Sequence, residues 1–162
     1  MLRELVTYHR PTDLNDALKL LSASKVKTVP LAGGTELLGR KDATIQAVVD
    51  LQDLGLNYVA READGLRIGA MTRLQRLVTE PTIREIASEI ISQCALKSAA
   101  FTERYSATVG GTIAAAPAWH DVLPALLSVD AWGVLRSETE RSIIPLDTLL
   151  ANRAVHLTRG IL

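Results

Sequence analysis

The sequence has only one cysteine, Cys94, among its 162 residues. A single thiol forms no disulfide within the chain, which excludes a secreted module held by disulfides and favours a reducing, cytoplasmic compartment. One cysteine also cannot hold an iron–sulfur cluster. The three histidines, His9, His120 and His156, have no second ligand at metal-binding spacing, so the sequence predicts no metal site.

Aromatic residues and excess charge are scarce as well. Aromatics make up 4% of the chain, too few for a platform on which nucleic-acid bases stack. Lys and Arg together number 18, as do Asp and Glu, and no basic run is longer than Arg40-Lys41. Apolar runs such as 122–127 fall far short of the ~20 residues that cross a bilayer, and the N-terminus has no apolar core of signal-peptide length. The sequence therefore predicts a globular protein that binds neither nucleic acid nor a membrane.

The hydrophobic pattern divides the chain into two expected parts. The fold class predicted is α+β in two subdomains, with residues 1–55 as a small α/β unit and residues 56–162 as a mainly antiparallel sheet with helices. The first part is expected to contain a helix from Leu14 capped by Thr12, a strand over 28–32, a short helix from Thr35 and a strand over 45–51.

The second part is expected to open on a hairpin, with strands over 57–63 and 66–70 and a turn at Asp64-Gly65. The further elements expected are a short helix capped by Thr72, a longer helix that begins at Pro81 and passes Cys94, a helix over 121–129, an antiparallel pair over 131–136 and 141–144, and a helical turn over 147–150.

A pair of glycines follows the first expected strand, in the segment Leu31-Ala32-Gly33-Gly34-Thr35-Glu36-Leu37-Leu38. Paired glycines allow a positive φ and let a ligand or another backbone segment approach closely. If a helix begins at Thr35, the exposed N–H groups suit a phosphate. An ordinary strand-to-helix turn is the competing and, for this segment alone, the commoner interpretation.

The same segment approaches the P-loop pattern, because Gly34 and Gly39 have the required spacing. Arg40, however, stands where that pattern has its lysine, and Lys41 stands where it has Ser or Thr. A phosphoryl-transfer function is therefore a remote alternative. No G-x-G-x-x-G run supports a Rossmann dinucleotide site either.

A second run of small residues covers Ala107-Thr108-Val109-Gly110-Gly111-Thr112-Ile113-Ala114-Ala115-Ala116. Close packing against a helix explains such a run, but an extended bound ligand explains its length and its free backbone donors better, since core strands favour Val, Ile and aromatics. Two such segments in one small chain raise the expectation of a large, phosphate-bearing cofactor.

Five stretches in this order resemble the FAD-binding subunit or domain of the molybdenum hydroxylases, a family that includes xanthine dehydrogenase and aerobic carbon monoxide dehydrogenase. The resemblance runs from end to end. The stretches are Tyr8-His9-Arg10-Pro11-Thr12, the segment 31–38, Leu66-Arg67-Ile68-Gly69-Ala70-Met71-Thr72, the segment 107–114, and 123–131.

The resemblance implies that FAD is the cofactor and that two segments hold it. The first would cradle the pyrophosphate with the backbone of Ala32, Gly33, Gly34, Thr35 and Glu36, flanked by Leu31 and Leu37. The second would contact the cofactor through Ala107, Thr108, Gly111, Thr112 and Ala114, with Asp121 at the polyol chain. The other acidic residues considered, Asp50, Asp53 and Glu103, are expected on solvated faces.

The resemblance also implies a function in electron transfer. A partner subunit would oxidise the substrate at a molybdopterin centre, another would carry iron–sulfur clusters, and FAD on this chain would pass the electrons to NAD or another acceptor. The flavin carries out the redox chemistry. No side chain is therefore expected to act as a catalytic acid or base.

Some residues depart from the family pattern. Thr112 stands where the family usually has Asn, Tyr105-Ser106 replaces Asn-Arg, and Pro117-Ala118 replaces Ser-Pro. Family subunits continue with a further strand and a C-terminal domain, which this chain is expected to lack. The alternative is therefore a truncated or degenerate member that binds FAD weakly or not at all and serves as a subunit-assembly module.

Overall fold

A parallel sheet organises the first third of the chain. The computed structural model describes residues 2, 4–23, 25–40, 42–157 and 160–162. Strands β1 (Thr7–His9), β2 (Thr28–Leu31) and β3 (Ala47–Asp50) pair in the order β1-β3-β2. All four residues of the central strand β3 are buried, as its apolar sequence requires when both edges are paired.

Helix α1 (Leu14–Ser22) packs on this sheet with Ala17 and Leu18 buried. Its cap is Asp13, not Thr12 as expected. Asp13 has extended backbone, and its carboxylate accepts hydrogen bonds from the N–H groups of Asn15 at 2.8 Å and Asp16 at 3.2 Å. Both residues are of a capping type, so the backbone geometry decides between them.

The short helix expected from Thr35 is absent from the described residues. Turns occupy 35–40 instead, with hydrogen bonds from the Leu38 N–H to the Gly34 carbonyl (3.0 Å) and from the Arg40 N–H to the Glu36 carbonyl (3.2 Å). The expectation was wrong because these bonds do not follow one another along the backbone as they do in an α-helix. Lys41, which entered the comparison with the P-loop, lies outside the described residues.

The rest of the chain is a helical body with two separate hairpins, not one mainly antiparallel sheet. The hairpins expected at Asp64-Gly65 and between 136 and 141 are confirmed. The strands are β4 (Val59–Glu62), β5 (Gly65–Ile68), β6 (Trp132–Arg136) and β7 (Arg141–Pro145). The helices are α2 (Leu74–Thr79), α3 (Pro81–Arg84), the 3-10 turn η1 (Ala87–Glu89), α4 (Ile90–Ser98), α5 (Phe101–Arg104), α6 (Val109–Ala115), α7 (Val122–Ser128), α8 (Leu146–Ala151) and α9 (Arg153–Leu157).

Two expected helices differ in detail. The long helix from Pro81 is broken, because Ser88 and Glu89 have left-handed backbone with φ of 52° and 65°. Left-handed residues cannot continue a right-handed helix, so α3 and α4 are separate. Thr72 does not cap α2: its hydroxyl donates to the Tyr58 carbonyl at 2.9 Å, and Arg73 takes the cap position.

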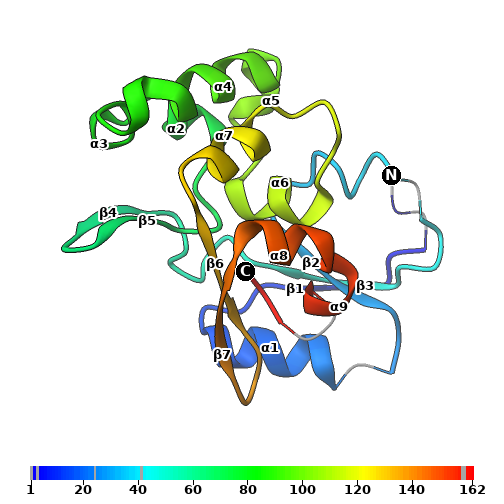
Figure 1. Cartoon of the computed structure of the whole chain (residues 1–162). Helices are drawn as coiled ribbons and strands as arrows, with labels where there is room; N and C mark the ends of the chain where they lie inside the picture. Colours follow the sequence, from blue (N-terminus) through cyan, green and yellow to red (C-terminus); the bar gives the residue numbers. More distant parts are fainter. Residues whose placement is uncertain (1, 3, 24, 41, 158–159) are drawn as a thin grey trace.

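Besides a small cluster of Leu2, Ile45 and Val48, two hydrophobic clusters hold the described elements together. The larger of these two joins α2, α4, α6, α7 and α8, and its fully buried members include Leu74, Leu77 and Leu149. Each such side chain contributes about 1.5–3 kcal/mol on burial. Figure 1 shows α2 to α5 gathered at one end of the molecule, with the β4–β5 hairpin projecting beside them.

The smaller cluster combines residues from both ends of the chain: Ala17, Leu18, Val49, Leu51, Met71 and Ile161. Ile161 also exchanges two backbone hydrogen bonds with Arg136, both 2.8 Å long, which tie the chain end to the β6–β7 hairpin. At the tip of that hairpin Glu138 accepts a hydrogen bond from Ser22 of α1. A boundary at residue 55 stays a prediction.

Candidate functional site

The first glycine segment leaves the parallel sheet at the edge where its strands end. Leu31, the last residue of β2, pairs with Asp50, the last of β3, and its carbonyl accepts from the Leu51 N–H at 3.0 Å. We call residues 32–37 the first loop. Ligands of α/β proteins commonly bind beyond the carboxyl ends of parallel strands, so the loop lies where a ligand is expected.

The first loop exposes a row of unpaired backbone donors. Within the described parts of the chain, the N–H groups of residues 32–37 donate to no acceptor. Gly34 has a φ of +74°, which favours glycine and turns the backbone within the loop. All six residues retain some exposure to solvent. Several free N–H groups in one loop suit the oxygens of a phosphate group.

The second small-residue run is not an extended loop. Residues Val109–Ala115 form helix α6, and the hydroxyl oxygen of Thr108 caps it by accepting from the Gly111 N–H at 3.1 Å. Gly110 donates its N–H to the Ala70 carbonyl at 2.8 Å, and a Cβ on Gly110 would lie 2.7 Å from the Cβ of Ala70. Gly110 therefore serves close packing, and a ligand contact along this run stays a prediction.

The structure brings the first loop and this run together. A Cβ added to Gly33 would collide with the carbonyl oxygen of Ser106 and lie 2.6 Å from its carbon. A Cβ on Gly111 would lie 3.7 Å from that of Ala32. The two segments, separated by some 70 positions in the sequence, thus form one continuous surface, and glycine is required where their backbones meet.

The predicted contact residues differ in accessibility. Ala107, Thr108 and Thr112 are buried, with exposed fractions of 3%, 2% and 5%. Gly111 is half-buried and Ala114 is exposed. Asp121 is exposed and precedes α7 without capping it through its side chain. Direct contact with a ligand is therefore open to Gly111, Ala114 and Asp121, while the buried three hold the backbone in place.

Asp50 is the acidic residue whose surroundings sequence reasoning missed. It was expected on a solvated face, but only 5% of it is exposed. Its carboxylate accepts from the Tyr8 hydroxyl and from the Gln52 N–H at 2.9 Å. The hydrogen bond to Asp50 raises the pKa of the Tyr8 phenol, and burial adds to the shift. The sequence does contain a signal for this burial, because Asp50 directly follows the apolar residues of β3.

Asp53 keeps the exposed position expected of it. It pairs with Arg10 at 2.7 Å, and this hydrogen bond lowers the pKa of the Asp53 carboxyl and raises that of the guanidinium. Exposed ion pairs of this kind contribute little to stability. The ion pair links the segment that follows β3 to the segment that follows β1.

A buried histidine lies between α6 and α7. His120 is 5% exposed, and its Nδ1 has no hydrogen-bond partner in the described part of the chain. No three His, Cys, Asp or Glu side chains among the described residues group as a metal site would require. None of the helices described is long and apolar enough to span a bilayer.

Two open hollows lie elsewhere on the surface. One has a volume of about 250 Å³ and lies beside Trp132 and Asp130, and the other, of about 240 Å³, lies beside helix α2. Neither is lined by a residue predicted to bind FAD. The fit of the chain to the expected cofactor therefore rests on the first loop, whose free N–H groups suit phosphate oxygens.

Comparison with known proteins identifies relatives over nearly the whole chain. The family described as "FAD binding domain in molybdopterin dehydrogenase" matches residues 4–160. The carbon monoxide dehydrogenase medium chain of Afipia carboxidovorans is 35% identical over 124 residues, covering 74% of this chain and 42% of that protein. The uncharacterized protein YgfM of Escherichia coli K12 is 34% identical over 129 residues, covering 76% and 47%.

Solved structures show the same fold. Carbon monoxide dehydrogenase from Hydrogenophaga pseudoflava, in a form that lacks the Mo-pyranopterin moiety, superposes with a TM-score of 0.86 at 26% identity, covering 93% of this chain and 53% of that one. Reconstituted CO dehydrogenase from Oligotropha carboxidovorans gives a TM-score of 0.83 at 29% identity, covering 90% and 52%. The chain thus spans about half the length of the relatives it matches.

Proposed function

Because this chain belongs to the family of FAD-binding domains in molybdopterin dehydrogenases, we propose that it binds FAD as the flavin-carrying part of a molybdenum hydroxylase. It is homologous to the medium chains of such oxidoreductases. The observation that carries the proposal is the row of free N–H groups in the first loop, at the carboxyl edge of the parallel sheet.

The first loop would hold the pyrophosphate. The backbone N–H groups of Ala32, Gly33, Gly34, Thr35 and Glu36 would donate to its oxygens, with Leu31 and Leu37 on either side. Preformed loops cost little ordering entropy on binding. The contact of Gly33 with Ser106 fixes the loop against the segment before α6, so the donors are held in place before the cofactor arrives.

The second segment would supply the remaining contacts. Gly111 and Ala114 offer backbone and methyl surface, and the exposed carboxylate of Asp121 would accept hydrogen bonds from polyol hydroxyls. The buried residues Ala107, Thr108 and Thr112 would support this surface from beneath. Thr112 lacks the side-chain amide that the family has at this position, and its hydroxyl offers one donor where the amide offers two.

Bound FAD would supply the redox chemistry. Electrons from substrate oxidation at a molybdopterin centre on one partner subunit would reach it through iron–sulfur clusters on another, and NAD or another acceptor would receive them. The residues of this chain would bind and orient the cofactor and exclude water from it. None of them is assigned as an acid or base.

A second candidate function is an assembly module with the same fold and a weak or lost cofactor site. It is favoured by Gly110 of α6, whose side-chain position is occupied by Ala70, and by the position of the two hollows described above, away from the first loop. In that case the fold would serve only to contact partner subunits.

Titration with FAD, followed by flavin fluorescence and absorbance, separates the two functions. Saturable one-to-one binding that Gly34→Val weakens at least tenfold supports the flavin site. Gly55→Val is the matched control, because Gly55 also has a positive φ (+69°) but has no neighbour within 4 Å of an added Cβ. Indifference of the wild-type chain to FAD, or equal loss in both variants, would contradict the proposal and leave the assembly module.

A further inference from the structure

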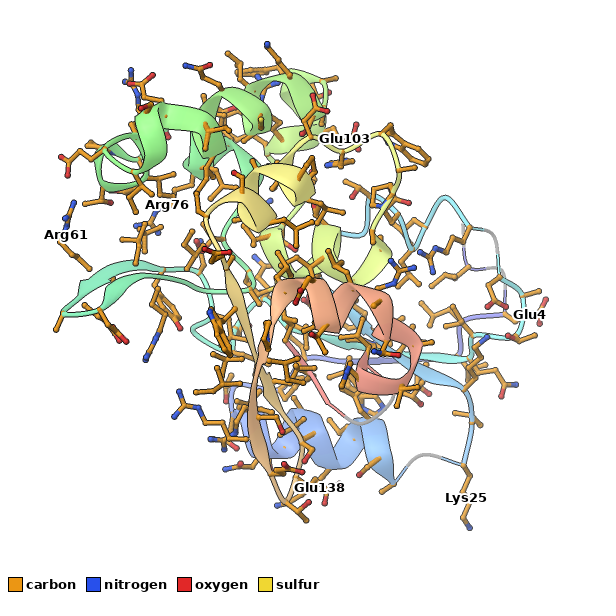
Figure 2. The ribbon with its side chains drawn as sticks, viewed as in Figure 1. Glu4, Lys25, Arg61, Arg76, Glu103 and Glu138 are labelled. Atoms are coloured by element: carbon orange, nitrogen blue, oxygen red, sulfur yellow. The ribbon has the colours of Figure 1, made fainter. Side chains whose placement is uncertain are left out.

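The hollow beside helix α2 carries two arginines and no carboxylate in its lining. It has a volume of about 240 Å³ and is lined by Asn57, Arg73, Gln75, Arg76, Thr79 and Tyr105. In Figure 2 Arg76 lies on the side of the molecule from which the β4–β5 hairpin projects. None of these six residues belongs to the predicted FAD site, so the proposed function leaves this positively charged recess unexplained.

Arg73 is the least compensated charge of the hollow. It forms no ion pair with any carboxylate among the described residues, and one of its Nη groups donates to the backbone carbonyl of Tyr105. A guanidinium carries five N–H donors in a fixed fork, so most of its donors remain for a ligand. Arg76, three positions on, donates from Nε to Glu80 at 3.0 Å and keeps its Nη groups. Of the two guanidinium groups, only that of Arg76 is paired with a carboxylate among the described residues.

Contacts with neighbouring side chains hold the other walls of the hollow in position. Arg104 is only 7% exposed, and its Nε donates to the side-chain oxygen of Gln75 at 3.0 Å. Because that oxygen is engaged, the NH₂ group of Gln75 remains as a donor. The Tyr105 ring is braced by Phe101, with ring centroids 4.9 Å apart. Preorganised donors lose little entropy when they bind a ligand.

We infer that this hollow binds the phosphate group of a small phosphorylated molecule, with Arg73 as the principal contact. A tetrahedral oxyanion has oxygens in several directions, which matches guanidinium donors from α2 together with the amides of Gln75 and Asn57. A carboxylate has two oxygens in one plane and would use fewer of these donors. The volume is below the ~300–1,000 Å³ typical of sites for larger ligands, which favours a small one.

The site is separate from the first loop but borders the second segment. The backbone of Arg73 forms a bridge with Thr108, the cap of α6, while its side chain extends to Tyr105. The inference does not depend on FAD binding, because no residue is shared between the hollow and the first loop.

The test is an NMR titration of the ¹⁵N-labelled chain with inorganic phosphate, at an ionic strength kept constant with sodium chloride. The side-chain amides of Asn57 and Gln75 report directly on the hollow, and we expect saturable shifts of both. Arg73→Gln should weaken binding at least tenfold. Arg141→Gln, an exposed arginine on β7 with the same change of charge, should leave the affinity within twofold. Arg73→Lys, which keeps the charge without the fork, should fall between them.

Three results would overturn the inference: equal affinities in Arg73→Gln and Arg141→Gln, shifts confined to residues 32–37, or an equal response to acetate, which would identify a carboxylate site. Failure of this site and failure of the flavin site are distinguishable. Gly34→Val should abolish FAD binding and leave the phosphate shifts of Gln75 unchanged, whereas Arg73→Gln should leave FAD affinity unchanged.

Discussion

The first loop and the run 107–116 carry nearly the same sequence signal, a Gly-Gly pair among alanines and threonines, yet they use it in opposite ways. In the described residues, the N–H groups of the first loop have no acceptor, whereas Gly110 and Gly111 donate theirs to the Ala70 carbonyl and the Thr108 hydroxyl. A glycine pair therefore indicates only a close backbone approach. The partner of each N–H distinguishes a ligand loop from a packed helix.

The comparison also separates two roles within the first loop. Gly33 is needed because another part of the protein, Ser106, occupies the space of its side chain. Gly34 has a positive φ, and a Cβ there would lie 3.2 Å from the flexible side chain of Leu38. Substitutions at the two neighbours should therefore damage different properties, stability at Gly33 and ligand binding at Gly34.

The largest expected effect is that of Gly33→Val. The added side chain collides with the Ser106 carbonyl, and backbone must move, so we expect the free energy of unfolding to fall by about 3 kcal/mol or more. Urea unfolding monitored by circular dichroism measures this difference in the free energy of unfolding. Gly39→Val is the control, since the atoms nearest to its added Cβ would be carbonyl oxygens 3.5 Å away. Equal stability of the two variants would show that the first loop does not contact residue 106.

A smaller effect is expected from Gly110→Ala in the packed helix. Its methyl group would crowd Ala70 at 2.7 Å, and the gain in helix propensity offsets part of the cost, leaving a loss of about 1–2 kcal/mol. Removing the opposing methyl with Ala70→Gly should restore stability in the double variant. Strictly additive losses in that double-mutant cycle would contradict the packing explanation.

The smallest effect concerns the anchor of the first loop. Tyr8→Phe removes the donor to Asp50, which pairs with the last residue before the loop, and should cost about 1 kcal/mol at neutral pH. The pKa of the Tyr8 phenol is raised from its ordinary 10.0, so its contribution is complete below pH 10 and is lost as the pH rises through the higher folded value. Thermal unfolding between pH 8 and pH 11 should show this loss in the wild type and not in the variant. Parallel curves for the wild type and Tyr8→Phe would rule out this pH-dependent contribution of the Tyr8 hydrogen bond.

Local patterns predicted the regular elements well. Asp64-Gly65 marks a tight hairpin, two short strands pair on either side of residues 137–140, and the apolar run from 122 forms a helix as expected. In each case the deciding interactions join residues that are close in the sequence, so a local pattern is enough to predict the element. The resemblance to a known family supplied FAD, which no composition or spacing could have named.

The remaining differences arise from contacts distant in sequence. Gly110 meets Ala70, which only the folded chain brings near. The burial of Asp50 likewise depends on Tyr8, which is 42 positions away. None of these partners is visible in a local window.

The exchange of hydrogen bonds between Ile161 and Arg136 has a kinetic consequence. Ile161 completes a cluster whose other members, such as Ala17, Leu18 and Val49, are made more than a hundred positions earlier. Contacts of such long sequence separation form slowly, because a large loop must close first. During synthesis, the contacts of Ile161 with α1 and β3 can form only after residue 161 has left the ribosome, so the apolar surface that it covers stays open to solvent or to a chaperone until then.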